Sequence, residues 1–337
     1  MKIMVAMSGG VDSTVTAHKL KNEGHEIAGV YLQLFNNDEY HKKNIDKIKK
    51  VAEYLDIEYH ILNIADKFAK NVYDPFVQTY IDGKTPNPCV WCNKTIKFGE
   101  MLKFAKEQGY EKLATGHYIR IKDGLLQEAV DMTKDQTYFT SAIHPSTIKD
   151  LIFPLGESLK KDVKEYASQI TVLESFAKQA ESSEICFVDK TYIDILDRHT
   201  ETKKDGDVLD PSGKVVGKHK GYMHYTVGQR KGFTINGAHT PHYVLNVNND
   251  NNTIVVGELD DLKRNEFEAD DLNMFVSDTS FEAQIKIRYR SPKIKGTVTI
   301  KDGTASIKLD ENVMGIAKGQ RTVFYRDDLV IGSAEII

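Results

Sequence analysis

The sequence predicts an α/β protein in which a doubly wound parallel-sheet domain precedes a small β-rich module and a C-terminal β-barrel. In the first part of the chain, apolar runs alternate with amphipathic helical patterns, which is typical of parallel strands joined by helices. After residue 200, short alternating runs are separated by turn sequences, which favours antiparallel sheet. The length of 337 residues is sufficient for two or three domains.

The first predicted strand is the apolar run Ile3–Met7, which ends in the glycine turn Ser8-Gly9-Gly10. A helix is expected near residues 12–23. Further strands are predicted over Glu26–Leu32, Tyr59–Ile64 and Lys112–Thr115, and further helices around Ile45–Leu55, in the region up to Tyr80 and over Lys94–Lys106. Parallel sheets bind ligands at the carboxyl ends of their strands, so a site is expected beside Ser8.

The predicted domains are residues 1–203, 204–260 and 261–337. Within the first, residues 131–198 have a mainly helical pattern that is interrupted at Phe153–Gly156. In the two later domains, turn sequences with Gly, Asn, Asp and Pro recur between short alternating runs. We therefore expect a β-rich central module and a C-terminal β-barrel.

The composition is that of a soluble globular protein, with 40% hydrophobic and 28% charged residues. A net charge of −4 means that a nucleic-acid partner would need a local basic patch. No apolar run reaches the ~18 residues of a membrane span, and no signal peptide is recognisable, so a cytoplasmic location without a membrane partner is expected. Three cysteines indicate chemistry or metal binding rather than a disulfide framework.

The turn Ser8–Ser13 joins a strand end, two glycines and a helix start, an arrangement that binds anions through backbone N–H groups. It lacks the lysine of the GxxxxGK[ST] loop. Asp12 would repel phosphates unless a cation such as Mg²⁺ stands between them. The alternative interpretation is an ordinary βα turn that is capped by Ser8 or Asp12.

Cys89 and Cys92 form a Cys-X-X-Cys pair after a proline-rich loop. The helix that follows is predicted to begin at about Asn93, which would place Cys92 at a helix N-terminus, a setting that lowers a thiol pKa. The pair is compatible with half of a zinc site, a redox pair or one reactive cysteine with a bystander. Together with Cys186 it could hold an iron–sulfur cluster. Taken alone, Cys186 lies between apolar residues as a buried core cysteine would.

Other polar residues have both structural and functional interpretations. His117 ends a predicted strand and could be a base, a phosphate ligand or a cap. Lys286, Arg288 and Arg290 alternate along a predicted strand, so one basic face could bind a phosphate backbone, although a solvated face is the alternative. The aromatic and cationic segment Tyr222–Gly232 is either a strand with a turn or a second nucleic-acid contact.

With these motifs in this order, the chain resembles the tRNA-specific 2-thiouridylases, ATP-dependent enzymes that thiolate the wobble uridine of tRNA. The resemblance extends over nearly the whole length. It rests on Ala6–Ser13, Thr85–Pro88, Cys92-Asn93, Ile96–Phe98, Ala114–Tyr118, Lys134–Gln136, Phe153–Gly156, Ser183–Val188, Tyr225–Gly232 and Arg288–Arg290.

The resemblance implies a role for each of several residues. ATP would be bound by Ala6, Met7, Ser8, Gly9, Gly10, Val11, Asp12, Ser13, Leu32 and Gly116. Cys186 would carry sulfur as a persulfide, and Cys92 would be the nucleophilic partner thiol that forms a transient disulfide with it. The target base would be faced by Asn87, Pro88 and Cys89. Contacts with tRNA would come from His117, Lys134, Asp135, Gln136, Tyr289, Arg290 and Gln320.

The resemblance also implies adenylation of the 2-carbonyl oxygen of uridine 34 with ATP and Mg²⁺, and persulfide attack that releases AMP. A protein would donate the persulfide sulfur, and an iron–sulfur cluster on Cys89, Cys92 and Cys186 is the less favoured alternative.

The sequence departs from the family pattern at three places. The segment after Leu32 lacks a longer acidic insertion, position 89 is Asp in some members, and Glu181 stands where Asp is common. Rival functions are an amidotransferase-type synthetase or an iron–sulfur tRNA thiolase with the same kind of loop, and a non-catalytic RNA-binding protein.

Overall fold

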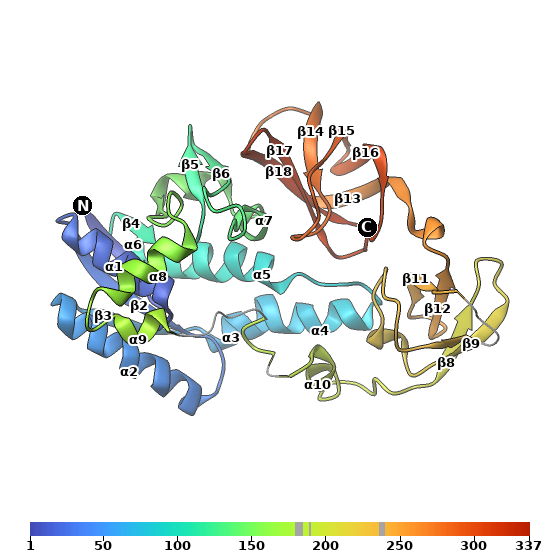
Figure 1. Ribbon diagram of the computed structural model, residues 1–337, viewed down its shortest axis with the longest axis horizontal. Coiled ribbons are helices and arrows are strands. Elements are labelled where there is room, and N and C mark those ends of the chain that lie inside the picture. Colours follow the sequence, from blue (N-terminus) through green and yellow to red (C-terminus); the bar gives the residue numbers. More distant parts are fainter. Residues whose placement is uncertain (179–184, 189, 236–239) are drawn as a thin grey trace. The chain divides into compact units, whose positions relative to one another are not determined.

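The computed structural model describes residues 1–178, 185–188, 190–235 and 240–337, and the chain divides into two compact units (Figure 1). The first unit comprises Met1–Val72, Cys89–Ser183 and Arg326–Ile331. The second comprises Tyr73–Pro88, Glu184–Tyr325 and Gly332–Ile337. Both units are therefore discontinuous in sequence, and each draws on widely separated parts of the chain.

The first unit is built on a parallel sheet with the strand order β3-β2-β1-β4-β7. Its strands are β1 (Lys2–Ala6), β2 (Glu26–Gln33), β3 (Tyr59–Asn63), β4 (Lys112–Ala114) and β7 (Leu151–Ile152). The chain adds β2 and β3 on one side of β1 and then β4 and β7 on the other. This confirms the predicted doubly wound sheet and puts the topological switch point between β1 and β4.

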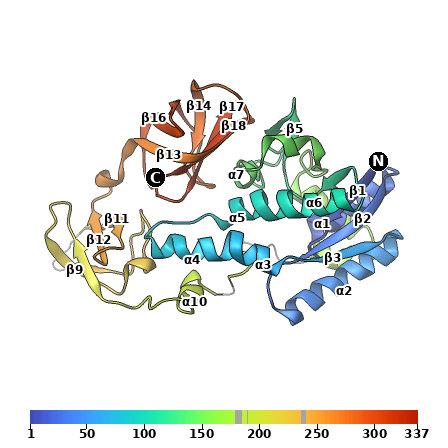
Figure 2. The ribbon, with the colours of Figure 1, turned by 180° about the vertical axis from the view of Figure 1, so that it is seen from behind.

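Helices connect and cover these strands. They are α1 (Val11–Asn22), α2 (Asp38–Leu55), α3 (Ala65–Phe68), η1 (Ala69–Tyr73), α5 (Pro88–Trp91), η2 (Cys92–Met101), α6 (Leu102–Glu107), α7 (Thr137–Thr140), η3 (Pro145–Asp150), α8 (Lys160–Ser168) and α9 (Glu174–Ala177). Figure 1 shows α1 and α8 lying over the sheet, which Figure 2 shows from behind.

The sheet is buried on both faces. Val5 of β1 shares one apolar cluster with Val15 of α1, Val51 of α2 and Val163 of α8. Met4, the neighbour of Val5, is also fully buried but points to the opposite face, because successive strand residues alternate. On that side α6 contacts β4. Burial on both faces explains why the β1 sequence is a continuous apolar run.

The region 131–198 is less helical than predicted, since its helices are short and β7 lies among them. A hairpin of β5 (Arg120–Lys122) and β6 (Leu125–Gln127) precedes it and was not predicted. The hairpin turns through Asp123 and Gly124, both with positive φ. In the first unit Gln127 also pairs with Leu329, a partner from the end of the chain that no local pattern reveals.

The second unit contains α4 (Asp74–Ile81), α10 (Tyr192–Leu196) and two β structures. The central sheet has the order β10-β9-β8-β12-β11. Its elements are β8 (Gly206–Leu209), β9 (Val215–His219), η4 (Tyr222–His224), β10 (Thr234–Ile235), β11 (Tyr243–Asn248), β12 (Thr253–Gly257) and η5 (Asp260–Leu262). Tyr225, Val244 and Ile254 form part of its core.

The C-terminal structure is a closed barrel, as predicted. Its strands are β13 (Arg264–Met274), β14 (Ser280–Lys286), β15 (Ile294–Lys301), β16 (Thr304–Val313), β17 (Arg321–Arg326) and β18 (Leu329–Ile336). They follow the order β13-β16-β15-β14-β17-β18, and β13 pairs with both β16 and β18, which closes the barrel. Figure 1 draws these strands in orange and red.

Candidate functional site

The turn Ser8–Ser13 lies at the switch point, after β1 and before α1. Gly9 adopts φ +79°, a conformation that glycine reaches without strain. Ser13 Oγ accepts a hydrogen bond from the Ser8 N–H at 3.2 Å and donates one to the Gly10 carbonyl at 3.0 Å. Gly10 is the N-cap residue of α1, and no side chain forms a capping hydrogen bond there. The alternative of a turn capped by Ser8 or Asp12 is therefore wrong. The first N–H groups of α1 can therefore donate hydrogen bonds to a bound anion.

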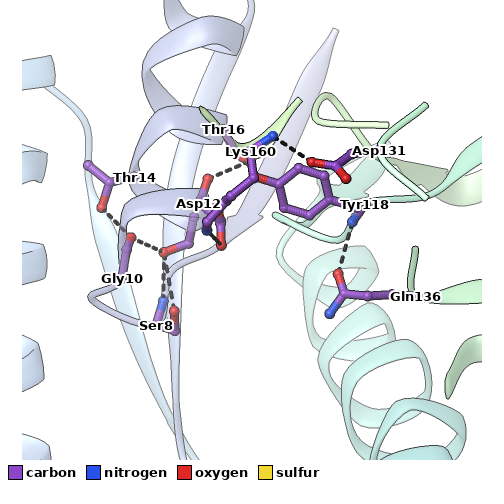
Figure 3. Close-up of polar contacts among 10 residues, drawn as sticks. Ser8, Gly10, Asp12, Thr14, Thr16, Tyr118, Asp131, Gln136 and Lys160 are labelled. Carbon is purple, nitrogen blue, oxygen red and sulfur yellow. Dashed lines mark hydrogen bonds and ion pairs between the residues drawn. The ribbon is translucent and has the colours of Figure 1, made fainter. Parts of the chain in front are cut away.

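The carboxylate of Asp12 is held by two side chains from distant parts of the sequence (Figure 3). Lys160 Nζ lies 2.6 Å from each of its oxygens, and the Tyr118 hydroxyl donates to Oδ1 at 2.9 Å. Lys160 is 9% exposed, so its ammonium group is largely shielded from water. A cationic side chain of the protein thus lies beside Asp12, and the predicted Mg²⁺ between Asp12 and phosphates stays a prediction.

Both partners of Asp12 are fixed by the segment 131–136. The backbone N–H of Lys160 donates to Asp131 Oδ2 at 2.9 Å, and Gln136 bonds both backbone groups of Tyr118, at 2.9 and 3.1 Å (Figure 3). Burial acts to raise the pKa of Asp131, but hydrogen bonds from Lys160 and Thr133 outweigh it and lower the pKa. Asp131 therefore stays ionised and holds the start of α8.

Gly116 packs directly against the turn. A Cβ atom on Gly116 would lie 2.9 Å from the Asp12 carbonyl carbon, closer than real Cβ contacts, and 3.0 Å from the Ser13 nitrogen, which is also tight. The structure therefore brings Gly116 together with Asp12 and Ser13, while their binding of ATP stays a prediction. Leu32 is half-buried near the end of β2, the strand beside β1.

His117 is buried beside this site. Its Nδ1 lies 2.7 Å from Thr115 Oγ1, and its Nε2 lies 3.5 Å from Lys97 Nζ. Burial, and secondarily the charge of Lys97, lowers the pKa of His117 well below 6.5. The imidazole is therefore neutral at neutral pH, and its contact with tRNA stays a prediction.

Cys92 lies inside a helix rather than at its N-terminus. The helix begins at Pro88, and α5, η2 and α6 follow one another without a break, so the predicted start near Asn93 is wrong. Cys92 is 7% exposed, and the helix-terminus argument for its activation no longer holds. Cys89 occupies the first turn instead, where burial raises its pKa against a smaller opposing effect of Lys97. The π-helical η2 is of a type that often occurs at functional sites.

Cys186 is exposed, in a turn in which the Val188 N–H donates to the Ile185 carbonyl at 2.9 Å. Within the second unit, the neighbouring Phe187 packs on Phe76, with ring centroids 5.2 Å apart. The interpretation of Cys186 as a buried core residue is therefore wrong. Ser183 and Glu184 of the same motif, and Glu181, lie outside the described residues.

Family models match three successive parts of the chain, and relatives match its full length. Residues 1–190 match a tRNA methyl transferase HUP domain, 193–258 a tRNA methyl transferase PRC-barrel domain, and 264–336 an aminomethyltransferase beta-barrel domain. The tRNA-specific 2-thiouridylase MnmA of Campylobacter curvus is 53% identical over 338 residues, and that of Campylobacter jejuni is 54% identical over 337 residues, each with 100% of both chains covered. The chain belongs to the tRNA-specific 2-thiouridylase family.

Among solved structures, a 4-thiouridine synthetase–RNA complex with bound ATP is similar at 16% identity and a TM-score of 0.37, covering 58% of this chain and 49% of that chain. The likeness is far weaker than that to the 2-thiouridylase family, and nothing further follows from it.

In this member of the thiouridylase family, some residues expected to contact tRNA also have structural partners. Asp135 is 2% exposed, and its carboxylate accepts hydrogen bonds from Ala129 N–H and the Thr137 hydroxyl. Lys134 and Gln136 flank it on the segment that holds Lys160 and Tyr118. Direct contacts between this segment and tRNA stay predictions.

The predicted basic strand face is wrong in one respect. β14 ends at Lys286, and the chain then bends because Ser291 Oγ accepts the N–H groups of Ile287 and Arg288, both at 3.2 Å. Arg288 turns inward and donates from Nη2 to the Val227 carbonyl at 3.1 Å. Arg290 is exposed. The cations therefore do not form one row, and their contacts with tRNA stay predictions, as does that of Tyr289.

The aromatic half of Tyr222–Gly232 belongs to the second unit's interior. Tyr225 is 3% exposed, and the Tyr222 hydroxyl donates to the Ile81 carbonyl at 2.6 Å. These tyrosines therefore have structural roles, but the predicted strand is wrong, because Tyr222–His224 form the 3-10 helix η4. Arg230 and Lys231 are exposed.

The described residues contain no group of three or more His, Cys, Asp or Glu side chains that could hold a metal ion. Within the described residues, the Asp12 carboxylate is engaged by Lys160 and Tyr118. In the described part of the chain, no helix combines the length and apolarity needed to cross a membrane.

Proposed function

We propose that this chain catalyses the ATP-dependent thiolation of uridine 34 in tRNA to 2-thiouridine. Membership of the 2-thiouridylase family over the full length supports the reaction class. The observation that carries the nucleotide half is the turn Ser8–Ser13 at the switch point, with Asp12 held by Lys160 and Tyr118.

The first step activates the base. The uridine 2-carbonyl oxygen attacks the α-phosphate of ATP, an O–P bond forms, and pyrophosphate leaves. Ala6–Ser13, Leu32 and Gly116 bind ATP, which enters as its Mg²⁺ complex. Unlike a GxxxxGK[ST] loop, this turn has no lysine of its own, and the Lys160 ammonium provides positive charge beside it.

The second step transfers sulfur. The terminal sulfur of a Cys186 persulfide, loaded by a donor protein, bonds to C2 of the base while the C2–O bond breaks and AMP leaves. The Cys92 thiolate then attacks Cys186 Sγ, which breaks the S–S bond and leaves sulfur on the base. The resulting Cys92–Cys186 disulfide takes two electrons from two cellular thiols, which become a disulfide themselves, before the next cycle. The exposure of Cys186 supports its loading by another protein.

The tRNA half of the proposal is carried by family membership. The target base leaves the anticodon stack, as in base-flipping enzymes, and faces Asn87, Pro88 and Cys89. The residues proposed to contact tRNA are His117, Lys134, Asp135, Gln136, Tyr289, Arg290 and Gln320.

The proposal is tested by incubating an unmodified tRNA transcript with ATP, Mg²⁺ and a sulfur donor, followed by mass spectrometry of the nucleosides. The wild-type protein should form 2-thiouridine. Cys186→Ser should form none, since serine cannot carry sulfane sulfur, but should still release pyrophosphate in the presence of tRNA. Formation of 2-thiouridine by Cys186→Ser would contradict the sulfur route.

Rival functions give different results in the same assay. An iron–sulfur thiolase would show iron and visible absorbance after anaerobic purification and would need Cys89 as a ligand, so Cys89→Ser would also be inactive. A synthetase would not need Cys92 or Cys186. A methyl transferase would need no sulfur donor, and a non-catalytic RNA-binding protein would release no tRNA-dependent pyrophosphate.

A further inference from the structure

The loop that leads to Asn87 and Pro88 starts from a fixed helix end in the second unit. The Lys84 N–H donates to the Thr79 carbonyl at 2.9 Å and completes the C-terminal turn of α4. The Ile81 carbonyl accepts the hydroxyl of Tyr222 at 2.6 Å. The chain then continues as Thr85-Pro86-Asn87-Pro88, in which the two prolines have no N–H to donate. The order of this loop must therefore come largely from other parts of the structure.

The barrel supplies that order through a loop just before β17. The Thr85 N–H donates to the Lys318 carbonyl at 2.8 Å. The side-chain amide of Gln320 donates from Nε2 to the Thr85 carbonyl at 2.9 Å and to the Pro86 carbonyl at 3.2 Å. We call these contacts among Thr85, Pro86, Lys318 and Gln320 the clasp. They satisfy three consecutive backbone groups that the loop itself cannot pair.

Gly319, at the centre of the clasp, brings the two backbones together. It adopts φ +84°, and a Cβ atom there would lie 3.0 Å from the Thr85 carbonyl oxygen. The loop is in turn tied to β18, because the Gly319 N–H donates to the Ile336 carbonyl at 2.9 Å and the Ile336 N–H to the Gln320 carbonyl at 2.8 Å. The clasp is therefore anchored on strand β18 of the barrel rather than on another surface loop.

We propose that Gln320 is a positioning residue for thiolation: through the clasp, it lets the C-terminal barrel set the place of Asn87 and Pro88. This inference rests on the proposed function, in which these two residues face the target base. Both N–H groups of the Gln320 amide are used within the protein, so a contact between Gln320 and tRNA would fall to its carbonyl oxygen. The barrel thus influences the position of the reacting base indirectly, by fixing the loop that carries Asn87 and Pro88.

The first test measures the clasp without activity. Gln320→Met keeps the length of the side chain but removes its donors. Amide exchange of the peptide that contains Thr85 and Asn87, followed by mass spectrometry on the full-length protein, should accelerate about tenfold, as expected for the loss of one or two hydrogen bonds. Lys318→Ala is the matched control, because it removes an exposed side chain of the same loop but keeps the carbonyl that accepts from Thr85, and exchange should stay unchanged.

The second test separates positioning from tRNA binding. In Gln320→Met, kcat for thiolation should fall about tenfold, as for a misplaced reacting group, while the Kd for tRNA stays within about twofold. Gly319→Ala keeps the Gln320 side chain but crowds Thr85, so the clasp predicts a similar fall in kcat, whereas a role of Gln320 purely in tRNA binding predicts none. The thermal midpoint of each variant checks that it is folded.

Unchanged exchange in Gln320→Met would overturn the clasp. Faster exchange with an unchanged kcat would overturn its role in the reaction, and a loss of tRNA affinity with an unchanged kcat would assign Gln320 to tRNA binding instead. Failure of the wild-type protein to thiolate would contradict the proposed function, and the exchange experiment would still report on the clasp by itself.

Discussion

At the scale of single residues, Asp12 shows how a carboxylate can stand in a turn that we propose binds phosphate. An unpaired carboxylate would repel the phosphates, but Lys160 and Tyr118 hold Asp12 at 2.6 and 2.9 Å. The Lys160 side chain is 11% exposed and that of Asp12 is 32% exposed, so the lysine is the more deeply buried partner. The pair is therefore a fixed local dipole beside the turn rather than a net negative charge.

We predict that Lys160→Met lowers kcat/KM for ATP about a hundredfold in tRNA-dependent pyrophosphate release, because it removes a preorganised cation and leaves Asp12 uncompensated. Lys161→Met is the matched control, since Lys161 is the exposed neighbour on α8. Equal effects of the two substitutions would show that Lys160 has no particular role at the turn.

The buried, neutral His117 should make stability depend on pH. Its pKa is lowered well below 6.5 in the folded state, so below that pH the unfolded state binds the proton more readily. The stabilisation is complete above pH 6.5 and is lost as the pH falls through the folded-state pKa. His18, His219 and His224 also have lowered pKa values. Several histidines therefore contribute to the pH dependence of the free energy of unfolding of the wild-type protein.

The contribution of His117 is isolated by comparing urea midpoints of wild type and His117→Gln between about pH 8 and pH 5. The variant should lose less stability than the wild type on acidification. Parallel curves would mean that His117 does not titrate differently in the folded and unfolded states.

At the scale of elements, the start of α1 packs on the turn after β4 without space for a side chain at position 116. A Cβ atom on Gly116 would lie 2.9 Å from backbone of Asp12, whereas one on Gly10 would meet only Ser8 Oγ at 3.5 Å, an ordinary contact. Close packing therefore excludes a side chain at position 116, whereas neighbouring atoms leave room for a Cβ atom at position 10.

We expect Gly116→Ala to destabilise the protein by about 1–3 kcal/mol through overpacking and to raise KM for ATP, since α1 must shift away from β4. Gly10→Ala is the paired comparison and should change stability by less than about 1 kcal/mol. Urea unfolding monitors stability, and pyrophosphate release gives KM. Equal destabilisation by both substitutions would contradict the packing argument.

The fold was predictable from sequence where a local period decides it. Alternation of apolar runs and helices predicted the sheet, and the turn at Ser8 followed from one short string. Lys160 was not predictable, because it lies 148 residues from Asp12 and only the fold brings them together. The prolines before Cys92 predict an extended loop, but proline also suits the first position of a helix, and the helix begins at Pro88. The bend after Lys286 depends on a single hydroxyl, that of Ser291.

At the scale of the whole molecule, net charge does not provide RNA affinity, so local cations must. Arg288 and Arg290 are two residues apart but differ in surroundings. Arg288 is half-buried and bonds the Val227 carbonyl, which ties the central module to the barrel inside the second unit. Arg290 is exposed. The two substitutions should therefore have separable effects.

Arg290→Ala should weaken tRNA binding and reduce the slope of log K against log salt by about 1, as for the loss of one phosphate contact. Arg288→Ala should lower the free energy of unfolding by about 1 kcal/mol through the lost hydrogen bond and change the salt slope little. Titration of tRNA at several salt concentrations, together with urea unfolding, checks both. The reverse pattern would return Arg288 to the RNA interface.

The segment Arg326–Ile331 has a consequence for how the chain is made. It belongs to the first unit, where Asp328 Oδ2 accepts from Gln127 at 2.7 Å and pairs with Arg120 at 3.2 Å. Asp328 lies 208 residues after Arg120 and 201 residues after Gln127, so the first unit gains these contacts only after most of the second unit has been synthesised. A stop codon placed at a domain boundary would therefore leave Arg120 and Gln127 without Asp328. Expression of the first unit therefore requires a chain that includes Arg326–Ile331.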